Sequence, residues 1–230
     1  MMFTSEEIQS IFLTFKLSFV VTIILILFST PLCIWLAKSR GYLSKIVNSI
    51  VTLPLILPPT VLGFYLLIFL SDNYFFNNFL SPLGINIQPF SFSGLVFASV
   101  IYSLPFAVQP ILNGLQNLDQ RYIEIAKTNG LNKLDRFVNV VLPLTYKNFL
   151  TASILCFTHT IGEFGVILMI GGNIPGETKV LSIQIYEYVE ILNYSSANKL
   201  GLFLIALAFF TLFFLYCLQT NKIKSRLNNA

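Results

Sequence analysis

The sequence predicts an all-α integral membrane protein that forms a single transmembrane domain over residues 1–230, with five membrane-spanning helices. Hydrophobic residues make up 55% of the chain and charged residues only 10%, whereas roughly 25% charged residues are usual in soluble domains. The apolar residues gather in runs of about the 20 residues that a helix needs to cross a bilayer. Such runs are helical, because lipid offers no partner for backbone N–H and C=O groups.

Five apolar runs are long enough to be spans. They cover residues 11–37, 46–70, 92–112, 149–170 and 200–218. We expect the first run to be retained as a span, because Glu6 and Glu7 stand where a signal peptide carries basic residues and the run is too long for a signal sequence. The fourth run contains a carboxylate, Glu163, and the single histidine of the chain, His159.

The distribution of Lys and Arg predicts the orientation of the spans. Membrane proteins keep an excess of these residues in their cytoplasmic segments. The segments after the first and third runs, together with the C-terminal tail, hold eleven of the fourteen basic residues. These are Lys38, Arg40, Lys45, Arg121, Lys127, Lys133, Arg136, Lys147, Lys222, Lys224 and Arg226. We therefore predict an N-terminus outside the cell and a cytoplasmic C-terminus.

Prolines interrupt the second and third runs. Pro58 and Pro59 lie in the second run, and Pro105 and Pro110 lie in the third. Proline inside a helix removes a backbone hydrogen bond and costs about 3 kcal/mol, and membrane helices tolerate it where neighbours or a water-lined cavity satisfy the freed groups. Two interpretations remain open: the prolines produce kinks for packing, or the kinked helices line a translocation path.

Residues 113–147 form the longest cytoplasmic segment, and their pattern predicts a helix–turn–helix. Apolar residues recur there at helical spacing, at Leu115, Leu118, Tyr122 and Ile125. Asn117 or Asp119 is a suitable N-cap, and Gly130 suits the left-handed position after a helix. A second helix follows, which we expect to end at Pro143.

Within this segment, Glu124-Ile125-Ala126 is followed after three residues by Gly130 and after nine more by Val140-Val141-Leu142-Pro143. The arrangement resembles the cytoplasmic signature of the permeases of ABC-type importers, Glu-Ala-Ala, Gly and Ile-x-Leu-Pro at the same spacings. The departures, Ile125 and Val140, are apolar replacements. The resemblance implies a coupling helix that docks on a separate ATPase subunit. It assigns to this coupling segment the residues Glu124, Ala126, Gly130, Leu142 and Pro143. The alternative is an ordinary amphipathic surface helix.

The chain itself lacks an ATP-binding motif. Residues 171–178 have the G-x-x-x-x-G frame, but Glu177 stands where the phosphate-binding lysine is required. We therefore expect no cofactor and no catalytic residue in this chain, with ATP-Mg used by the partner ATPase. The three cysteines, Cys33, Cys156 and Cys217, lie in apolar runs without metal-ligand spacing, so we expect buried free thiols and no metal site.

Three further stretches carry a resemblance to one branch of this family. Residues 53–63 read Leu-Pro-Leu-Ile-Leu-Pro-Pro-Thr-Val-Leu-Gly, residues 162–165 read Gly-Glu-Phe-Gly, and residues 172–178 read Gly-Asn-Ile-Pro-Gly-Glu-Thr. They are similar to segments of the molybdate permeases, and the Gly-Glu-aromatic-Gly element is shared with sulfate permeases. The resemblance implies import of molybdate, with tungstate, sulfate or another oxyanion as alternatives.

The same resemblance implies the partners of the chain. Two copies would form the pore in the bilayer of the bacterial inner membrane. An ATP-binding subunit would dock on the cytoplasmic side, and an extracytoplasmic molybdate-binding protein would meet the outer loops. A nucleic-acid partner is not expected, because the net charge of +4 is mild and the bases lie in short segments between spans.

The candidate residues of the translocation path or gate are Pro58, Pro59, Glu163, Gly165 and Asn173. An acid inside the membrane is costly and faces the interior of a bundle. Because a carboxylate repels a dianion, a structural or gating role of Glu163 is favoured over contact with the substrate. His159 lies four residues earlier, so the two side chains could pair, as a satisfied pair or as a proton relay. Asn173 and the backbone N–H groups beside it could meet an oxyanion at the outer mouth, or this stretch could be a turn that ends the fourth span.

Two other classes of function are less well supported. A secondary transporter would use His159 and Glu163 as a proton site, but no internal repeat is visible across the spans. A membrane enzyme is disfavoured by the single histidine and the absence of a G-x-S-x-G motif.

Overall fold

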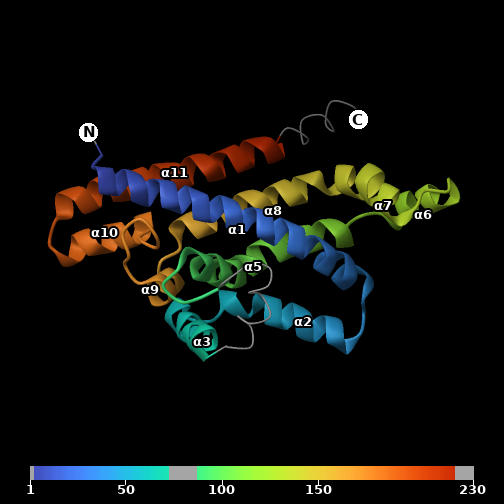
Figure 1. Cartoon of the computed structure of the whole chain (residues 1–230). Coiled ribbons are helices and arrows are strands. Elements are labelled where there is room, and N and C mark those ends of the chain that lie inside the picture. The colour runs from blue at the N-terminus through green and yellow to red at the C-terminus, as the bar shows by residue number, and fades with distance from the viewer. Residues whose placement is uncertain (1–2, 73–86, 221–230) are drawn as a thin grey trace.

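A computed structural model describes residues 3–72 and 87–220, and every regular element within these two ranges is a helix (Figure 1). The elements are α1 (Ser5–Lys38), α2 (Tyr42–Thr52), η1 (Leu53–Leu55), α3 (Pro59–Asp72), α5 (Phe92–Gln116), α6 (Gln120–Thr128), α7 (Lys133–Arg136), η3 (Phe137–Val141), α8 (Leu142–Gly162), α9 (Gly165–Gly171), α10 (Leu181–Glu190) and α11 (Tyr194–Thr220).

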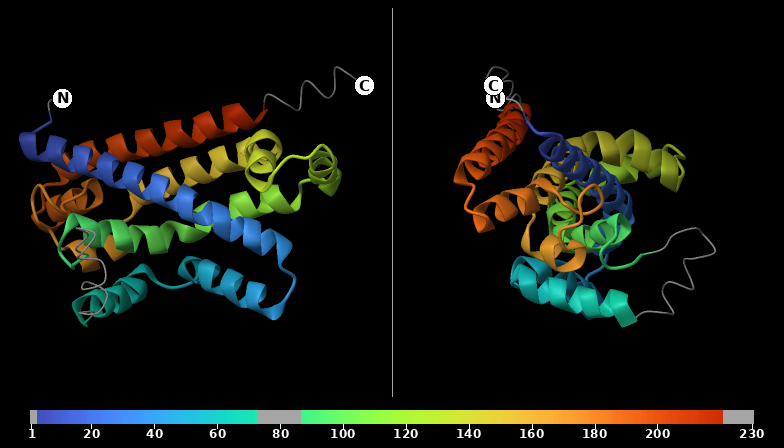
Figure 2. Two further views of the ribbon diagram at one scale, coloured as in Figure 1. Left: turned by 45° about the vertical axis from the view of Figure 1, so that its right-hand side comes forward. Right: turned by 60° about the vertical axis from the view of Figure 1, so that its left-hand side comes forward.

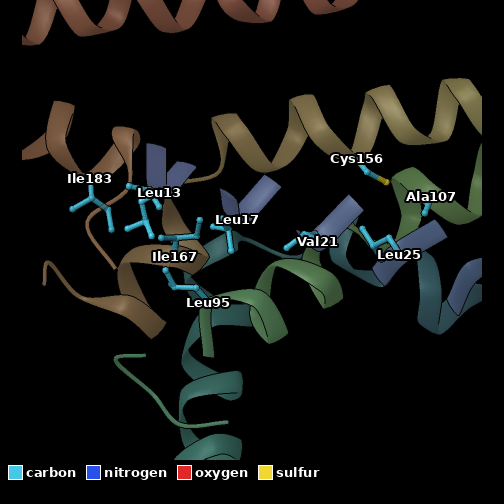
Figure 3. Packing of buried hydrophobic residues seen from close by; sticks show 10 residues of the cluster. Leu13, Leu17, Val21, Leu25, Leu95, Ala107, Cys156, Ile167 and Ile183 are labelled. Atoms are coloured by element: carbon cyan, nitrogen blue, oxygen red, sulfur yellow. The ribbon is translucent and has the colours of Figure 1, made fainter. Parts of the chain in front are cut away.

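The core lies where the long helices α1, α5 and α8 pack against one another. Leu17, Val21 and Leu25, which repeat every four residues and so lie on one side of α1, are fully buried. They belong to one cluster with Leu95 of α5 and Cys156 of α8 (Figure 3). Hydroxyl groups along the same helix donate to the carbonyl one turn earlier, so few polar groups in this part of the chain are left unpaired in the apolar interior.

Helix α1 begins six residues before the predicted first span. Thr4 is its N-cap: Glu7 N donates to Thr4 Oγ1, and Thr4 N donates to Glu7 Oε2 at 2.8 Å. This reciprocal capping box satisfies two backbone donors that a helix start otherwise leaves unpaired. Glu7, one of the two acidic residues before the first predicted span, therefore helps to fix the start of the first helix.

The second predicted span, residues 46–70, is not one helix in the structure. It is divided between α2 and α3, whose axes differ by 112° across a short break that contains Pro58. Pro54, Pro58 and Pro59 supply no backbone N–H, so the helical hydrogen-bond pattern cannot continue through this stretch. Of the helices in the described ranges, four are long and apolar enough to span a membrane, and the bent pair is a fifth if it counts as one span.

The fourth predicted span, residues 149–170, is placed differently. The crossing helix runs without interruption through α7, η3 and α8, from Lys133 to Gly162. Pro143 therefore does not end a helix, as predicted, but lies in the first turn of α8 directly after the π-helical turn η3. A π-helical turn changes the local hydrogen-bond spacing and lets the helix pass a residue without an N–H. The chain leaves the helix at Glu163, and the short α9 follows.

The two ends of the helical bundle differ in composition. The α1–α2 connection and the helices α6 and α7 lie at one end. The helices α9 and α10 lie at the other end, together with the N-terminus of α1 (Figures 1 and 2). Lys38, Arg40 and Lys45 are thus at the same end as the basic residues of α6 and α7. This grouping agrees with the charge pattern used to predict the orientation, which remains a prediction.

Candidate functional site

A helix–turn–helix projects from the basic end of the bundle (Figure 1); we call it the knuckle and define it as residues 120–141, which form α6, α7 and η3. Asp119 is the N-cap of α6, and its carboxylate accepts from Arg121 N at 3.0 Å. Asn132 caps α7 by accepting from Asp135 N at 2.9 Å. A capping side chain therefore defines the start of each of the two helices.

The turn of the knuckle is fixed by two backbone hydrogen bonds. Gly130 N donates to Lys127 O at 3.0 Å, and Leu131 N donates to Ala126 O at 3.1 Å. These two bonds form a Schellman motif, which needs a left-handed residue after the helix. Gly130 has a φ of 78° and confirms this part of the sequence prediction. The motif makes the knuckle a defined turn with a set direction.

The residues of the predicted coupling segment have different environments in the knuckle. Ala126 is buried, and Glu124 and Gly130 are exposed. Leu142 and Pro143 lie where the knuckle joins α8, with Leu142 half-buried and Pro143 exposed. The glycine turn and Glu124 are therefore at the surface of the knuckle, whereas the small Ala126 is not.

An exposed apolar face covers the knuckle. Its residues are Tyr122, Ile125, Leu134 and Val138, and Ile125 and Leu134 are 59% and 70% exposed. The predicted apolar stripe was wrong at its first two members. Leu115 belongs to α5 and is buried in the core, and the half-buried Leu118 lies between α5 and α6. The side chains of Tyr122, Ile125, Leu134 and Val138 are about half exposed or more, so they form an apolar patch on the surface of the knuckle.

Pro59 and Gly165, both proposed for the path, are in contact. A Cβ at Gly165 would lie 2.8 Å from Pro59 Cβ, and a Cβ at Gly63 would lie 2.8 Å from Met169 Cβ. The helices α3 and α9 therefore pack closely at two glycines, each of which leaves room for a side chain of the other helix. Pro58 O accepts from Val61 N at 3.0 Å and begins α3. The interruptions of the second and fourth predicted spans meet at this point.

Glu163 lies in the break between α8 and α9 and is only 3% exposed. Among the described residues, neither of its carboxylate oxygens has a hydrogen-bond partner of standard geometry. The Ser99 hydroxyl of α5 is the polar group that faces the carboxylate. The backbone is held instead, because Ser182 Oγ donates to Glu163 O at 2.6 Å.

His159 and Glu163 do not form the predicted pair. The helix ends at Gly162, so Glu163 has an extended backbone and the i, i+4 geometry is lost. His159 Nδ1 is hydrogen-bonded to Ser103 Oγ at 2.9 Å, and its ring stacks on Phe106 with centroids 4.1 Å apart. The histidine is thus a half-buried residue whose Nδ1 is paired with Ser103 and whose ring is packed on Phe106, without the contact to Glu163 that a proton relay needs.

The loop that contains Asn173 is a tight turn. Thr178 Oγ1 donates to Gly171 O at 2.7 Å and accepts from Ile174 N at 3.1 Å. Gly172 has a φ of 61° and its N–H donates to Leu168 O, so this group is already paired. Asn173 is exposed in the loop. The geometry matches the interpretation as a turn that ends a helix, and the Gly172 N–H is not available to an anion.

Sequence reasoning missed a buried ion pair near the N-terminus. Lys199 Nζ lies 2.7 Å from Glu7 Oε2, and Tyr188 Oη donates to Glu7 Oε1 at 3.3 Å. The only sequence signal was the presence of Glu6 and Glu7 before the first span and of Lys199 before the last. A second ion pair links Lys179 to Glu187 of α10, with Lys179 Nζ 2.6 Å from Glu187 Oε2.

The thiols and potential metal ligands form no site in the described ranges. No group of three or more His, Cys, Asp or Glu side chains comes together there. Cys33 and Cys156 are buried, but Cys217 is exposed on α11, which corrects the expectation of three buried thiols.

Comparisons with known proteins agree with this architecture. Residues 29–227 match the family described as binding-protein-dependent transport system inner membrane component. The chain is similar to the molybdenum transport system permease protein ModB of Azotobacter vinelandii, with 43% identity over 213 residues that cover 93% of this chain and 94% of that protein. It is 32% identical over 218 residues to ModB of Escherichia coli K12, which covers 92% and 93% of the two chains.

A solved structure shows that the fold is shared more widely. A bacterial ABC transporter involved in the import of the acidic polysaccharide alginate matches 96% of this chain and 81% of its own, with a TM-score of 0.73. The sequence identity is only 18%, so this likeness concerns the fold alone.

Proposed function

Because the chain belongs to the family of binding-protein-dependent transport system inner membrane components, we propose that it is the permease subunit of an ATP-driven importer of molybdate. The chain forms the translocation path in the membrane and hydrolyses no ATP itself. The relatives named as molybdenum transport permeases support the choice of substrate.

The knuckle is the observation that carries the coupling part of the proposal. It has a fixed glycine turn, lies at the basic end of the bundle and presents the apolar face of Tyr122, Ile125, Leu134 and Val138. An ATP-binding subunit that uses ATP-Mg would cover this face. Since α8 continues the second helix of the knuckle without interruption, a displacement of the knuckle is passed directly into a membrane-spanning helix.

The broken helices support the path part of the proposal. Irregular backbone within a membrane is tolerated where it is packed in protein or lines a water-filled cavity. The breaks at Pro58 and Glu163 meet through the Pro59–Gly165 contact, so the two half-helices α3 and α9 can move as one piece. We assign this region to the gate, with a second copy of the chain completing the pore.

The opposite end of the bundle would receive the substrate. It holds the loop of Asn173 and the first turn of α11. An extracytoplasmic molybdate-binding protein would dock there and release the oxyanion into the pore. Selectivity would reside mainly in that binding protein.

The proposal is tested by reconstitution of the permease with its ATP-binding subunit and its binding protein in liposomes. We expect ATP-dependent uptake of molybdate that an uncoupler does not abolish, and competition by tungstate. Uptake of sulfate that ignores molybdate and tungstate would make the substrate assignment wrong. Uptake without ATP that an uncoupler abolishes would favour a secondary transporter.

Gly130→Trp tests the coupling role in the same system. A bulky side chain at a φ of 78° disturbs the turn, so we expect loss of the co-purifying ATP-binding subunit and of uptake. Gly130→Asn is the matched control, because asparagine tolerates this backbone conformation. Gly41→Trp is the second control, since Gly41 lies at the same end of the bundle with no neighbour within 4 Å of a Cβ there.

A further inference from the structure

A surface cavity lined by amide side chains lies beside the half of α5 that leads into the knuckle. It has a volume of about 570 Å³ and is bounded by α5 and α8. Gln109, Asn113 and Gln116 face it from α5, and Asn148 and Thr151 face it from α8. The spacing of the α5 residues, four and then three, places them on one side of an otherwise apolar helix. Such a polar stripe has no role in lipid contact.

Several of these amides are held in position by neighbouring helices. Asn148 Nδ2 donates to Pro110 O at 3.1 Å, and a Cβ at Gly114 would lie 2.5 Å from Asn148 Cγ. Only glycine at position 114 lets α5 approach Asn148 this closely. Gln109 Nε2 donates to Asn48 Oδ1 of α2 at 3.4 Å, so a third helix contributes to the arrangement. The cavity is therefore built by packing and is more than a gap between surface side chains.

The amide groups leave hydrogen-bond donors for a ligand. Asn117 Nδ2 donates to Asn113 Oδ1 at 2.5 Å, which turns that oxygen toward Asn117 and leaves the NH₂ group of Asn113 for another partner. Gln116 is exposed and carries a second NH₂ group. No Asp or Glu is among the described residues that line the cavity. The lining thus offers donors without a repelling carboxylate.

Neutral hydrogen-bond donors are suited to a transport site, because the anion that binds there must also be released. Hydrogen bonds to an ionised acceptor are roughly twice as strong as neutral ones, so a few amides can replace part of the hydration of an oxyanion. A pocket of Arg or Lys would bind a dianion more tightly, whereas conduction needs a site that is weak enough to release its ion. With about 30 Å³ per water molecule, the cavity also has room for a partly hydrated tetrahedral anion.

We propose that this amide-lined cavity is a binding subsite for a tetrahedral oxyanion on the knuckle side of the pore. The subsite would hold the anion between the gate and its release. The inference rests on the proposed function, because that function provides the anion, but it concerns residues that the family signature does not contain.

The test introduces a negative charge without a change of shape. Gln116→Glu and Asn113→Asp are made in the complete transporter, reconstituted with its ATP-binding subunit and binding protein. At a separation of about 5 Å, the doubly charged anion and the new carboxylate repel each other. Even in water-like surroundings this repulsion lowers uptake roughly tenfold. ATPase activity stimulated by the binding protein should persist. Gln9→Glu, an exposed amide at the other end of the bundle, is the matched control and should leave uptake unchanged.

Each outcome decides for or against the subsite. A selective loss of uptake in both cavity variants, with normal ATPase activity and thermal stability, supports it. Wild-type uptake in both variants overturns it, and so does a joint loss of uptake, ATPase activity and stability, which would make the amides structural. If the wild-type transporter carries sulfate and not molybdate, the substrate assignment fails, and the same charge effect on sulfate uptake still supports the subsite.

Discussion

Lys199 Nζ lies 2.7 Å from Glu7 Oε2 at the end of the bundle opposite the knuckle. The Glu7 side chain is completely buried and that of Lys199 is 18% exposed. The pair joins the first turn of α1 to the first turns of α11, and the Tyr188 hydroxyl ties α10 to the same carboxylate. The helices α1, α10 and α11 are therefore connected at this end of the bundle through the buried Glu7 carboxylate.

We expect Lys199→Met to lower the free energy of unfolding by about 2 kcal/mol. Removal of one partner leaves a buried, uncompensated carboxylate, which costs roughly 3–5 kcal/mol for a fully buried pair and less here because Lys199 is partly exposed. Thermal unfolding of the purified protein measures the change. The double variant Glu7→Gln/Lys199→Met should recover most of the loss, and equal losses in the single and double variants would contradict this explanation.

Gly165→Ala should destabilise the contact between α3 and α9. The added methyl group would lie 2.8 Å from Pro59 Cβ, on a rigid ring that cannot turn away. We expect a cost of about 1–3 kcal/mol, which is usual for overpacking, and slower uptake. Gly162→Ala is the matched control three residues earlier, where a Cβ meets nothing within 4 Å. If the control were as damaging as Gly165→Ala, the close packing would not be the cause.

Glu163→Gln should be tolerated. No basic side chain is paired with Glu163 in the described residues, so a neutral amide of nearly the same shape breaks no ion pair and adds no buried charge. We expect unchanged or higher thermal stability and uptake within about twofold of wild type. A complete loss of uptake with normal stability would show that the ionisable group itself takes part in transport.

Ile125→Ser and Leu134→Ser should weaken the association with the ATP-binding subunit. Both side chains are largely exposed in the isolated chain, so the stability of the permease should change by less than about 0.5 kcal/mol. The amount of ATP-binding subunit that co-purifies should fall clearly. Ile191→Ser, at a residue 63% exposed at the other end of the bundle, is the control. Equal recovery of the subunit with all three variants would exclude this face as the docking surface.

Local chemistry made some of the structure predictable. The glycine at position 130 is needed by a left-handed turn, and Asp119 has the side chain to cap the next helix, so the turn and the start of α6 follow from neighbours in sequence. The prolines around position 58 indicated an interruption of the second span. The angle between the two parts does not follow from the sequence, and in the structure the axes of α2 and α3 differ by 112°. The predicted helix end at Pro143 was wrong, because the π-helical turn before this residue accommodates the missing N–H.

Other features depend on contacts between distant residues. Glu7 and Lys199 are 192 residues apart, and no local pattern indicates that they meet. The amide-lined cavity needs α2, α5 and α8 together, although its stripe of Gln109, Asn113 and Gln116 on an apolar helix was a readable signal. The helix end at Gly162 separated His159 from Glu163, which periodicity alone had placed on one face.

The knuckle can couple to an ATP-binding subunit only from the cytoplasmic side of the membrane. Lys133→Cys, at an exposed position of α7, is made in a Cys217→Ser background, which leaves only the buried thiols Cys33 and Cys156. A membrane-impermeant maleimide is applied to right-side-out and to inverted membrane vesicles, with Glu177→Cys in the exposed loop after α9 as the counterpart. We predict that Lys133→Cys reacts only in inverted vesicles and Glu177→Cys only in right-side-out vesicles. Reaction of Lys133→Cys in sealed right-side-out vesicles would place the knuckle outside, where ATP is not supplied, and would contradict the account.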